Sequence, residues 1–197
     1  MPDLMDGVAN FRRDVFPAKA RLFARLATEH RPTTLFIGCS DARVVPELIT
    51  RSEPGELFVI RTAGNLVPAH SPAPDGTAAS IEFAVAVLGV RDIIVCGHSG
   101  CGAMTALAEG RDLSGTPRLA SWLRHADASL ARAAAGEGTG EVTALVRANV
   151  SAQLRNLTTH PAVARALAEQ RLTLHGWVFD IGSGSVGRLE TPDRAGV

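Results

Sequence analysis

The sequence predicts an α/β fold with a mostly parallel four-stranded sheet, one further edge strand, helices on both faces and an N-terminal helical arm. Short, apolar, β-branched runs bounded by glycine or proline are typical of buried parallel strands. They alternate with longer segments in which apolar residues recur every three or four positions, as on one face of a helix. Because parallel neighbours need a long crossover connection, this alternation favours βαβ units.

The first 28 residues predict the helical arm. Pro17 suits the first turn of a second helix, which continues through Leu26. The first helix carries apolar residues at helical spacing: Leu4, Val8, Phe11 and Val15. An apolar stripe of this kind requires a cover, so the arm is expected to pack against something.

The core elements follow in order along the rest of the chain. A helix that starts near 75–77 separates the second and third strands and completes a βαβ unit. A Gly-rich surface loop is expected at 134–140 and a loose tail at 191–197. The predicted strands are 33–38, 57–61, 92–97 and 172–181, with a short return strand after a turn at 182–187, and the predicted later helices are 142–157 and 161–169.

Composition limits the class of protein. A chain of 197 residues with 46% hydrophobic content suits a single catalytic domain over 1–197. Twenty Lys+Arg balance twenty Asp+Glu, so we expect no nucleic-acid or membrane partner and a small substrate instead. The N-terminus lacks a signal-peptide pattern, and the most apolar stretch, 77–97, is interrupted by charged residues. We therefore expect a cytoplasmic protein whose three cysteines are thiols or metal ligands.

Two short motifs carry the chemistry, and each directly follows a predicted strand. They are Cys39-Ser40-Asp41-Ala42-Arg43 and His98-Ser99-Gly100-Cys101-Gly102. The carboxyl ends of parallel strands lie at one edge of a sheet, so the two motifs are expected to meet there. Two thiolates and an imidazole are ligands that zinc prefers, and a tetrahedral site with one exchangeable position activates water at neutral pH. The motifs therefore predict a catalytic zinc site.

Other interpretations compete with this one. A buried structural cysteine, or a histidine whose hydrogen bonds are made within the core, would explain either motif alone. This interpretation explains less readily why both motifs lie at equivalent strand ends. Arg43 has two interpretations: a bidentate partner that decides whether Asp41 binds the metal, or a surface cation. Cys96 alternates within an apolar strand and predicts core packing. The segment 61–65 predicts a tight turn at the same edge, with a substrate-side role as the alternative, and the remaining histidines predict structural or exposed roles: His30, His70, His125, His160 and His175.

Four segments together resemble the β-class carbonic anhydrases: 39–43, 53–59, 61–67 and 97–103, in a match that covers about 30–182. The resemblance implies a zinc enzyme that interconverts carbon dioxide and bicarbonate. It also implies a homodimer or homotetramer in which the arm wraps over a neighbour. The implied site residues are the zinc ligands Cys39, His98 and Cys101 and, beside the fourth position, the dyad of Asp41 and Arg43, with Asp41 a ligand in a closed form only.

Some positions depart from the family pattern. Ala42 stands where the family usually has Ser, and His30 where a Gln often helps to orient substrate. Phe36 replaces the Trp that is common in members with a regulatory bicarbonate pocket, although Arg61 matches the arginine of that pocket. The missing Trp argues against that form of regulation.

The expected mechanism is attack of zinc-bound hydroxide on carbon dioxide, with Asp41 orienting the nucleophile and Arg43 holding Asp41 off the metal. Two thiolates make the bound water less acidic than an all-histidine site would, so activity is expected to favour neutral to alkaline pH. Two alternatives remain: hydrolysis of carbon disulfide or carbonyl sulfide on the same scaffold, and a zinc-stabilised binding module without turnover. A dyad beside an open position disfavours the second.

Overall fold

A computed structural model describes residues 3–135 and 141–189. The chain divides into two compact units, Met1–Arg31 and Pro32–Val197. The predicted tail at 191–197 and most of the predicted loop at 134–140 lie outside the described residues.

The first unit consists of helices, as predicted. Helix α1 (Leu4–Asn10) continues through a π-helical segment, Phe11–Val15, into α2 (Phe16–Leu26). The Asp3 side chain caps α1 by accepting the N–H of Met5 at 2.9 Å. The unit exposes large apolar side chains, among them Leu4, Met5, Val8, Phe11, Val15 and Phe16.

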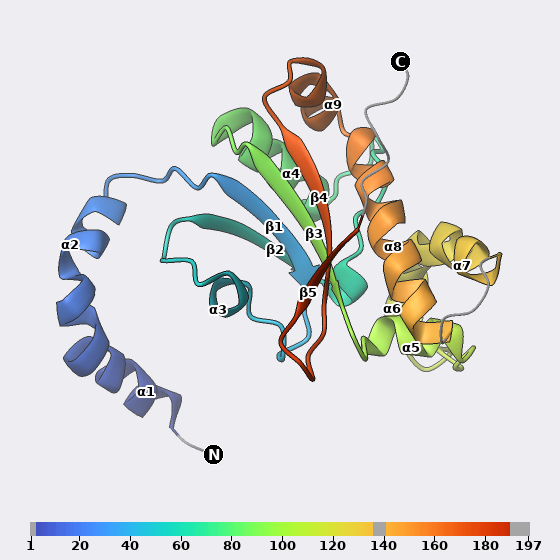
Figure 1. Ribbon diagram of the computed structural model, residues 1–197, viewed down its shortest axis with the longest axis horizontal. Helices are drawn as coiled ribbons and strands as arrows, with labels where there is room; N and C mark the ends of the chain where they lie inside the picture. The colour runs from blue at the N-terminus through green and yellow to red at the C-terminus, as the bar shows by residue number, and fades with distance from the viewer. Residues whose placement is uncertain (1–2, 136–140, 190–197) are drawn as a thin grey trace. The chain divides into compact units, whose positions relative to one another are not determined.

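The second unit is built on a five-stranded sheet with the strand order β2-β1-β3-β4-β5 (Figure 1). Strands β1 to β4 pair in parallel, and β5 is an antiparallel edge strand next to β4. Their bounds are Thr34–Cys39 for β1, Leu57–Thr62 for β2, Asp92–His98 for β3, Thr173–Phe179 for β4 and Val186–Leu189 for β5. The predicted sheet of four parallel strands with an edge strand is confirmed.

Helices lie around this sheet (Figure 1). Asp75 caps α4 through the N–H groups of Thr77 and Ala78, which explains why the helix begins where the sequence predicted. The short helices α3, α6 and α7 were not predicted. The bounds are α3 Pro46–Thr50, α4 Gly76–Glu82, α5 Gly102–Ala108, α6 Pro117–Leu123, α7 Asp127–Ala134, α8 Glu141–Thr158 and α9 Pro161–Ala168, with 3₁₀ turns at Ala63–Asn65 and Arg124–Ala126 and a π-helical segment at Phe83–Val87.

Alternate strand residues point to opposite faces of the sheet. Leu35 and Ile37 of β1 pack in a cluster with buried residues of α4, α8 and α9. Phe36 lies on the other face with Ile94 and Cys96, and Cys96 is fully buried there, as predicted for a core residue. Within the described ranges, no helix is both long and apolar enough to cross a membrane.

Long-range packing brings α8 close to the middle of the sheet. A Cβ atom placed on Gly97 of β3 would lie 2.9 Å from Val150 Cγ2 and 3.0 Å from Val146 Cγ1 of α8. This strand position therefore requires glycine for space. The next residue, His98, ends β3 at the same sheet edge at which Cys39 ends β1.

Candidate metal centre

Three buried side chains converge at the carboxyl edge of the sheet. Cys39 ends β1, His98 ends β3, and Cys101 is the N-cap of α5. The sulfur atoms of the cysteines and a ring nitrogen of His98 all lie within 4.8 Å of one another. A turn at Gly100, whose φ is +62°, returns the chain so that Cys101 comes back beside His98. The structure thus brings together the three residues that the motifs predicted as metal ligands.

A neighbouring carbonyl orients the His98 ring. Nδ1 and the carbonyl oxygen of Ser99 are 3.0 Å apart, so Nδ1 carries the proton and donates it to that oxygen. Ser99 is itself anchored, because its N–H donates to the Phe179 carbonyl at 2.9 Å and its hydroxyl accepts the Ile181 N–H at 2.9 Å. Nε2 of His98 is buried and has no hydrogen-bond partner among the described residues. A bare imidazole nitrogen facing two sulfurs is what a metal ligand requires.

The two thiols differ in their affinity for a proton. A hydrogen bond from Cys101 lowers the pKa of Cys39 to about 4, with burial opposing and with His98 and the backbone N–H groups of Asp41 and Gly64 adding to the decrease. The same Cys39–Cys101 hydrogen bond, and then burial, raises the pKa of Cys101. Burial lowers the pKa of His98, but Cys39 raises it more, so the net shift is upward. Two thiolates can coexist here only with a cation between them, so the donor set suits a soft divalent metal.

Asp41 and Arg43 form the predicted bidentate pair at the rim of this group. Arg43 Nε donates to Asp41 Oδ1 at 2.9 Å and Nη2 donates to Oδ2 at 2.7 Å. Nη2 also donates to the Gly100 carbonyl at 3.1 Å, which ties the two motifs together. Hydrogen bonds from the side chain and backbone of Arg43 hold the pKa of Asp41 well below its usual range. Asp41 Oδ2 lies 3.9 Å from His98 Nε2, so the carboxylate is beside the ligand group while Arg43 occupies both its oxygens.

A family model described as carbonic anhydrase matches residues 34–186. The chain belongs to the β-class carbonic anhydrases. It is 57% identical to a carbonic anhydrase of Pseudomonas aeruginosa strain PAO1, over 98% of this chain and 90% of that protein. It is 50% identical to carbonic anhydrase 1 of Escherichia coli O157:H7, with the same coverage.

Solved β-carbonic anhydrases share the fold. The β-carbonic anhydrase CcaA superposes with a TM-score of 0.89 at 41% identity, covering 95% of this chain and 93% of that one. A structure from a study of two tetrameric β-carbonic anhydrases of Sordaria macrospora superposes with a TM-score of 0.83 at 32% identity, covering 94% of each chain.

Arg61 has a structural role that sequence reasoning did not find. From the end of β2, its Nε donates to the Cys39 carbonyl at 3.0 Å and its Nη2 donates to the Asp41 carbonyl at 2.6 Å. It therefore holds the turn that carries both residues. The position of Arg61 at the carboxyl end of the neighbouring strand could have indicated that it lies near the two motifs. Its hydrogen bonds to backbone carbonyl groups could not be predicted, because every residue type has a carbonyl group.

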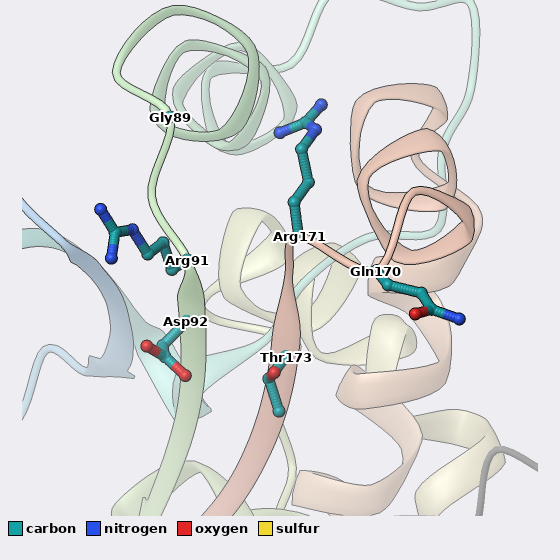
Figure 2. A pocket seen from close by; sticks show the side chains of 6 residues that line it. All are labelled: Gly89, Arg91, Asp92, Gln170, Arg171 and Thr173. Atoms are coloured by element: carbon teal, nitrogen blue, oxygen red, sulfur yellow. The ribbon is translucent and has the colours of Figure 1, made fainter.

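A surface pocket lies where β3 and β4 begin, and Figure 2 shows the residues that line it. Its lining includes Asp92 and Thr173, which begin β3 and β4. Two of its charged groups are already paired, Asp92 with His175 at 2.7 Å and Arg171 with Glu169. The pocket contains no cysteine or histidine, so it is separate from the metal centre.

Two of the remaining histidines have structural partners. His160 is buried and its Nε2 lies 3.0 Å from the Pro68 carbonyl oxygen, while His175 pairs with Asp92. Neither belongs to the Cys39–His98–Cys101 group.

Proposed function

We propose that this protein catalyses the reversible hydration of carbon dioxide to bicarbonate and a proton at a zinc ion held by Cys39, His98 and Cys101. The observation that carries the proposal is the convergence of two buried sulfurs and an unpartnered imidazole nitrogen within 4.8 Å, in a chain of this family. Zinc, when bound, supplies a Lewis acid that makes water a nucleophile near neutral pH.

The chain's own residues prepare the centre for this chemistry. The Ser99 carbonyl holds the proton of His98 on Nδ1 and leaves Nε2 for the metal. Cys39 and then burial raise the pKa of Cys101, and hydrogen bonds from the backbone N–H groups of Met104 and Ala103 offset part of this increase. The three ligand groups come from segments fixed by β1, β3 and the start of α5, so they are positioned before the metal binds.

Asp41 supplies an acceptor at the rim of the centre. Its low pKa keeps it a carboxylate throughout the neutral range, and its remaining lone pairs can accept a hydrogen bond from the attacking water and so orient the oxygen of that water. Arg43 holds both carboxylate oxygens, which keeps Asp41 from becoming a fourth metal ligand. Arg61 fixes the Asp41 carbonyl and thus the direction in which the Asp41 carboxylate faces the metal centre.

Assembly into a homodimer or homotetramer is part of the proposal. The first unit exposes a group of apolar side chains that a single chain of this size does not normally leave in water. The comparison structure described as tetrameric makes a tetramer reasonable for this chain as well. All three cysteines are free thiols, which suits a reducing compartment such as the cytoplasm.

Stopped-flow hydration of carbon dioxide tests the function. The purified protein is assayed as isolated, after removal of metal with a chelator, and after addition of zinc. We expect activity to disappear with the metal and to return with zinc. A protein that binds zinc at these residues but hydrates carbon dioxide no faster than buffer would instead be a zinc-stabilised binding module.

A further inference from the structure

Two backbone groups at the β4–β5 connection hold Ser99, the residue after His98. The Phe179 carbonyl accepts the Ser99 N–H at 2.9 Å, and the Ile181 N–H donates to the Ser99 hydroxyl at 2.9 Å. The carbonyl oxygen of Ser99 lies 3.0 Å from Nδ1 of His98. Strands β4 and β5 form a hairpin at the edge of the sheet (Figure 1). A single residue, Ser99, therefore connects this hairpin to the predicted metal ligand His98.

Asp180 lies between the two groups that hold Ser99. The peptide plane before Asp180 carries the Phe179 carbonyl, and the plane after it carries the Ile181 N–H. Because each peptide is rigid, only the φ and ψ of Asp180 set the angle between these two planes. Both groups reach Ser99 at once only if the backbone of Asp180 keeps one conformation. The contacts that fix Asp180 thus also fix Ser99.

The turn after β4 fixes both the side chain and the backbone of Asp180. Oδ1 of Asp180 accepts the Ser183 N–H at 2.8 Å and the Ser183 hydroxyl at 2.7 Å. The Asp180 N–H donates to the Ser185 carbonyl at 2.8 Å, and the Asp180 carbonyl accepts the Gly184 N–H at 2.9 Å. Gly184 has a φ of +70°, a left-handed conformation that favours glycine. The Asp180 carboxylate therefore closes the turn from within.

We propose that Asp180 is a positioning residue of the metal centre, which acts through Ser99 on the ring of His98. The inference rests on the metal site proposed above. With the turn closed, Ser99 is held at its N–H and at its hydroxyl, so its carbonyl stays where it accepts the Nδ1 proton of His98 and leaves Nε2 for the metal. With the turn open, the Ser99 carbonyl loses this support, and the His98 ring is free to rotate or to change tautomer.

Three variants test the proposal. Asp180→Ala removes the acceptor that closes the turn. Asp180→Asn is the conservative rescue, because its amide oxygen can still accept both hydrogen bonds from Ser183. Asp75→Ala is the matched control, because Asp75 also accepts two hydrogen bonds close to it in the chain, each at 3.1 Å, but it caps α4.

Two quantities are measured on each protein. Zinc affinity is measured by chelator competition. The exchange of the His98 Nδ1 proton with water is measured by ¹⁵N NMR of the histidine side chains in the zinc-loaded proteins. The second measurement reports on the bond to the Ser99 carbonyl, which a general loss of stability elsewhere in the chain would leave in place.

We expect Asp180→Ala to weaken zinc binding about 10-fold, the lower end of the range for groups that support a metal ligand, because Asp180 acts through one further residue. The His98 Nδ1 proton should exchange faster with water than in the wild type. Asp180→Asn and Asp75→Ala should leave both quantities at the wild-type value. Wild-type affinity and exchange in a folded Asp180→Ala protein would overturn the inference, and so would an Asp180→Asn protein that is as impaired as Asp180→Ala.

A double-mutant cycle with Ser99→Ala tests whether Asp180 acts through Ser99. Ser99→Ala removes the acceptor of the Ile181 N–H, so Asp180→Ala should cost less zinc affinity in that background than in the wild type. Equal losses in the two backgrounds would contradict this route. If Asp180→Ala does not fold, hydrogen exchange of the Ile181 amide in the wild type decides. Strong protection supports the bond to Ser99, and exchange as fast as in an exposed loop contradicts it.

The same measurements separate this inference from the proposed function. If the wild-type protein binds no zinc, the proposed metal site fails and this inference fails with it. If the wild-type protein binds zinc but does not hydrate carbon dioxide, the proposed function fails alone. The zinc affinities of Asp180→Ala and Asp180→Asn then still support or overturn the role of Asp180.

Discussion

Replacement of Gly97 by alanine tests the packing that positions His98. Gly97 lies one residue before His98 on β3, and its missing side chain leaves the space that α8 occupies. The added Cβ would meet Val150 Cγ2 at 2.9 Å and Val146 Cγ1 at 3.0 Å. Both valines are buried, so neither can swing into solvent, and strand and helix must separate by a few tenths of an ångström.

The size of the effect follows from this geometry. Overpacking a well-filled core by one methyl group typically destabilises by about 1–3 kcal/mol. For a chain of this length each kcal/mol lowers Tm by about 2–4 °C, so a decrease of about 2–12 °C is expected. Gly76→Ala is the matched control, because no atom lies within 4 Å of its added Cβ and it begins α4.

Urea unfolding measures the change in the free energy of unfolding. The protein concentration is held fixed, because assembly makes stability depend on concentration. The double variant Gly97→Ala with Val150→Ala removes one of the colliding methyl groups. We expect it to be more stable than the sum of the single effects by at least about 1 kcal/mol. If the two substitutions are additive, or if Gly97→Ala is as stable as Gly76→Ala, close packing of α8 on β3 does not constrain this position.

Three other predictions concern the dyad, the arm and acid. Arg43→Ala should retain zinc and lose most hydration activity. Arg43→Lys should restore little of it, because a point charge cannot replace the planar guanidinium group. Near-wild-type rates at equal zinc content in both Arg43→Ala and Asp41→Asn would show that the pair is only a surface ion pair. Deletion of residues 1–28 should reduce the assembly to smaller species in light scattering, whereas a full-length monomer at micromolar concentration would contradict the proposed role of the arm. Because hydrogen bonds from Arg43 hold the pKa of Asp41 below its ordinary 3.8, the stability that this carboxylate adds should be present above about pH 4 and lost as the pH falls below it. Urea unfolding of Asp41→Asn between pH 3 and 7 checks this, since the variant should lack that acid-dependent loss, and an equal loss in both proteins would exclude Asp41 as its source.

The sequence was sufficient for the sheet and for the metal-ligand group. Continuous apolar runs indicate buried parallel strands, and the residues that follow those runs lie at the carboxyl ends of the strands, on the same side of the sheet. Cys39 and His98 could therefore be placed together across about sixty residues. The spacing of Asp41 and Arg43 predicted a pair but could not decide between the metal and the guanidinium, because that choice depends on side-chain geometry at the Gly100 turn.

The supporting contacts could not be predicted from sequence. Arg61, Trp122 and Asn149 act on backbone carbonyl groups of segments 20 to 85 residues away, and any residue type can offer a carbonyl. The short helices α3, α6 and α7 have too few turns for an apolar period to stand out. The structure adds the contacts that depend on long-range packing. The cysteine, histidine, aspartate and arginine residues of the two motifs could be identified from the sequence.

Zinc K-edge X-ray absorption on the purified protein, with zinc content measured on the same sample, tests the metal centre most directly. We predict about one zinc per chain, with two sulfur ligands at about 2.3 Å, one nitrogen ligand at about 2.0–2.1 Å and one further light atom. Cys96→Ala should give the same spectrum, whereas Cys101→Ala should lose a sulfur or the metal. Two results would contradict a catalytic site built from Cys39, His98 and Cys101. One is folded protein, purified without a chelator, that contains no zinc, and the other is zinc that is bound without two sulfur ligands.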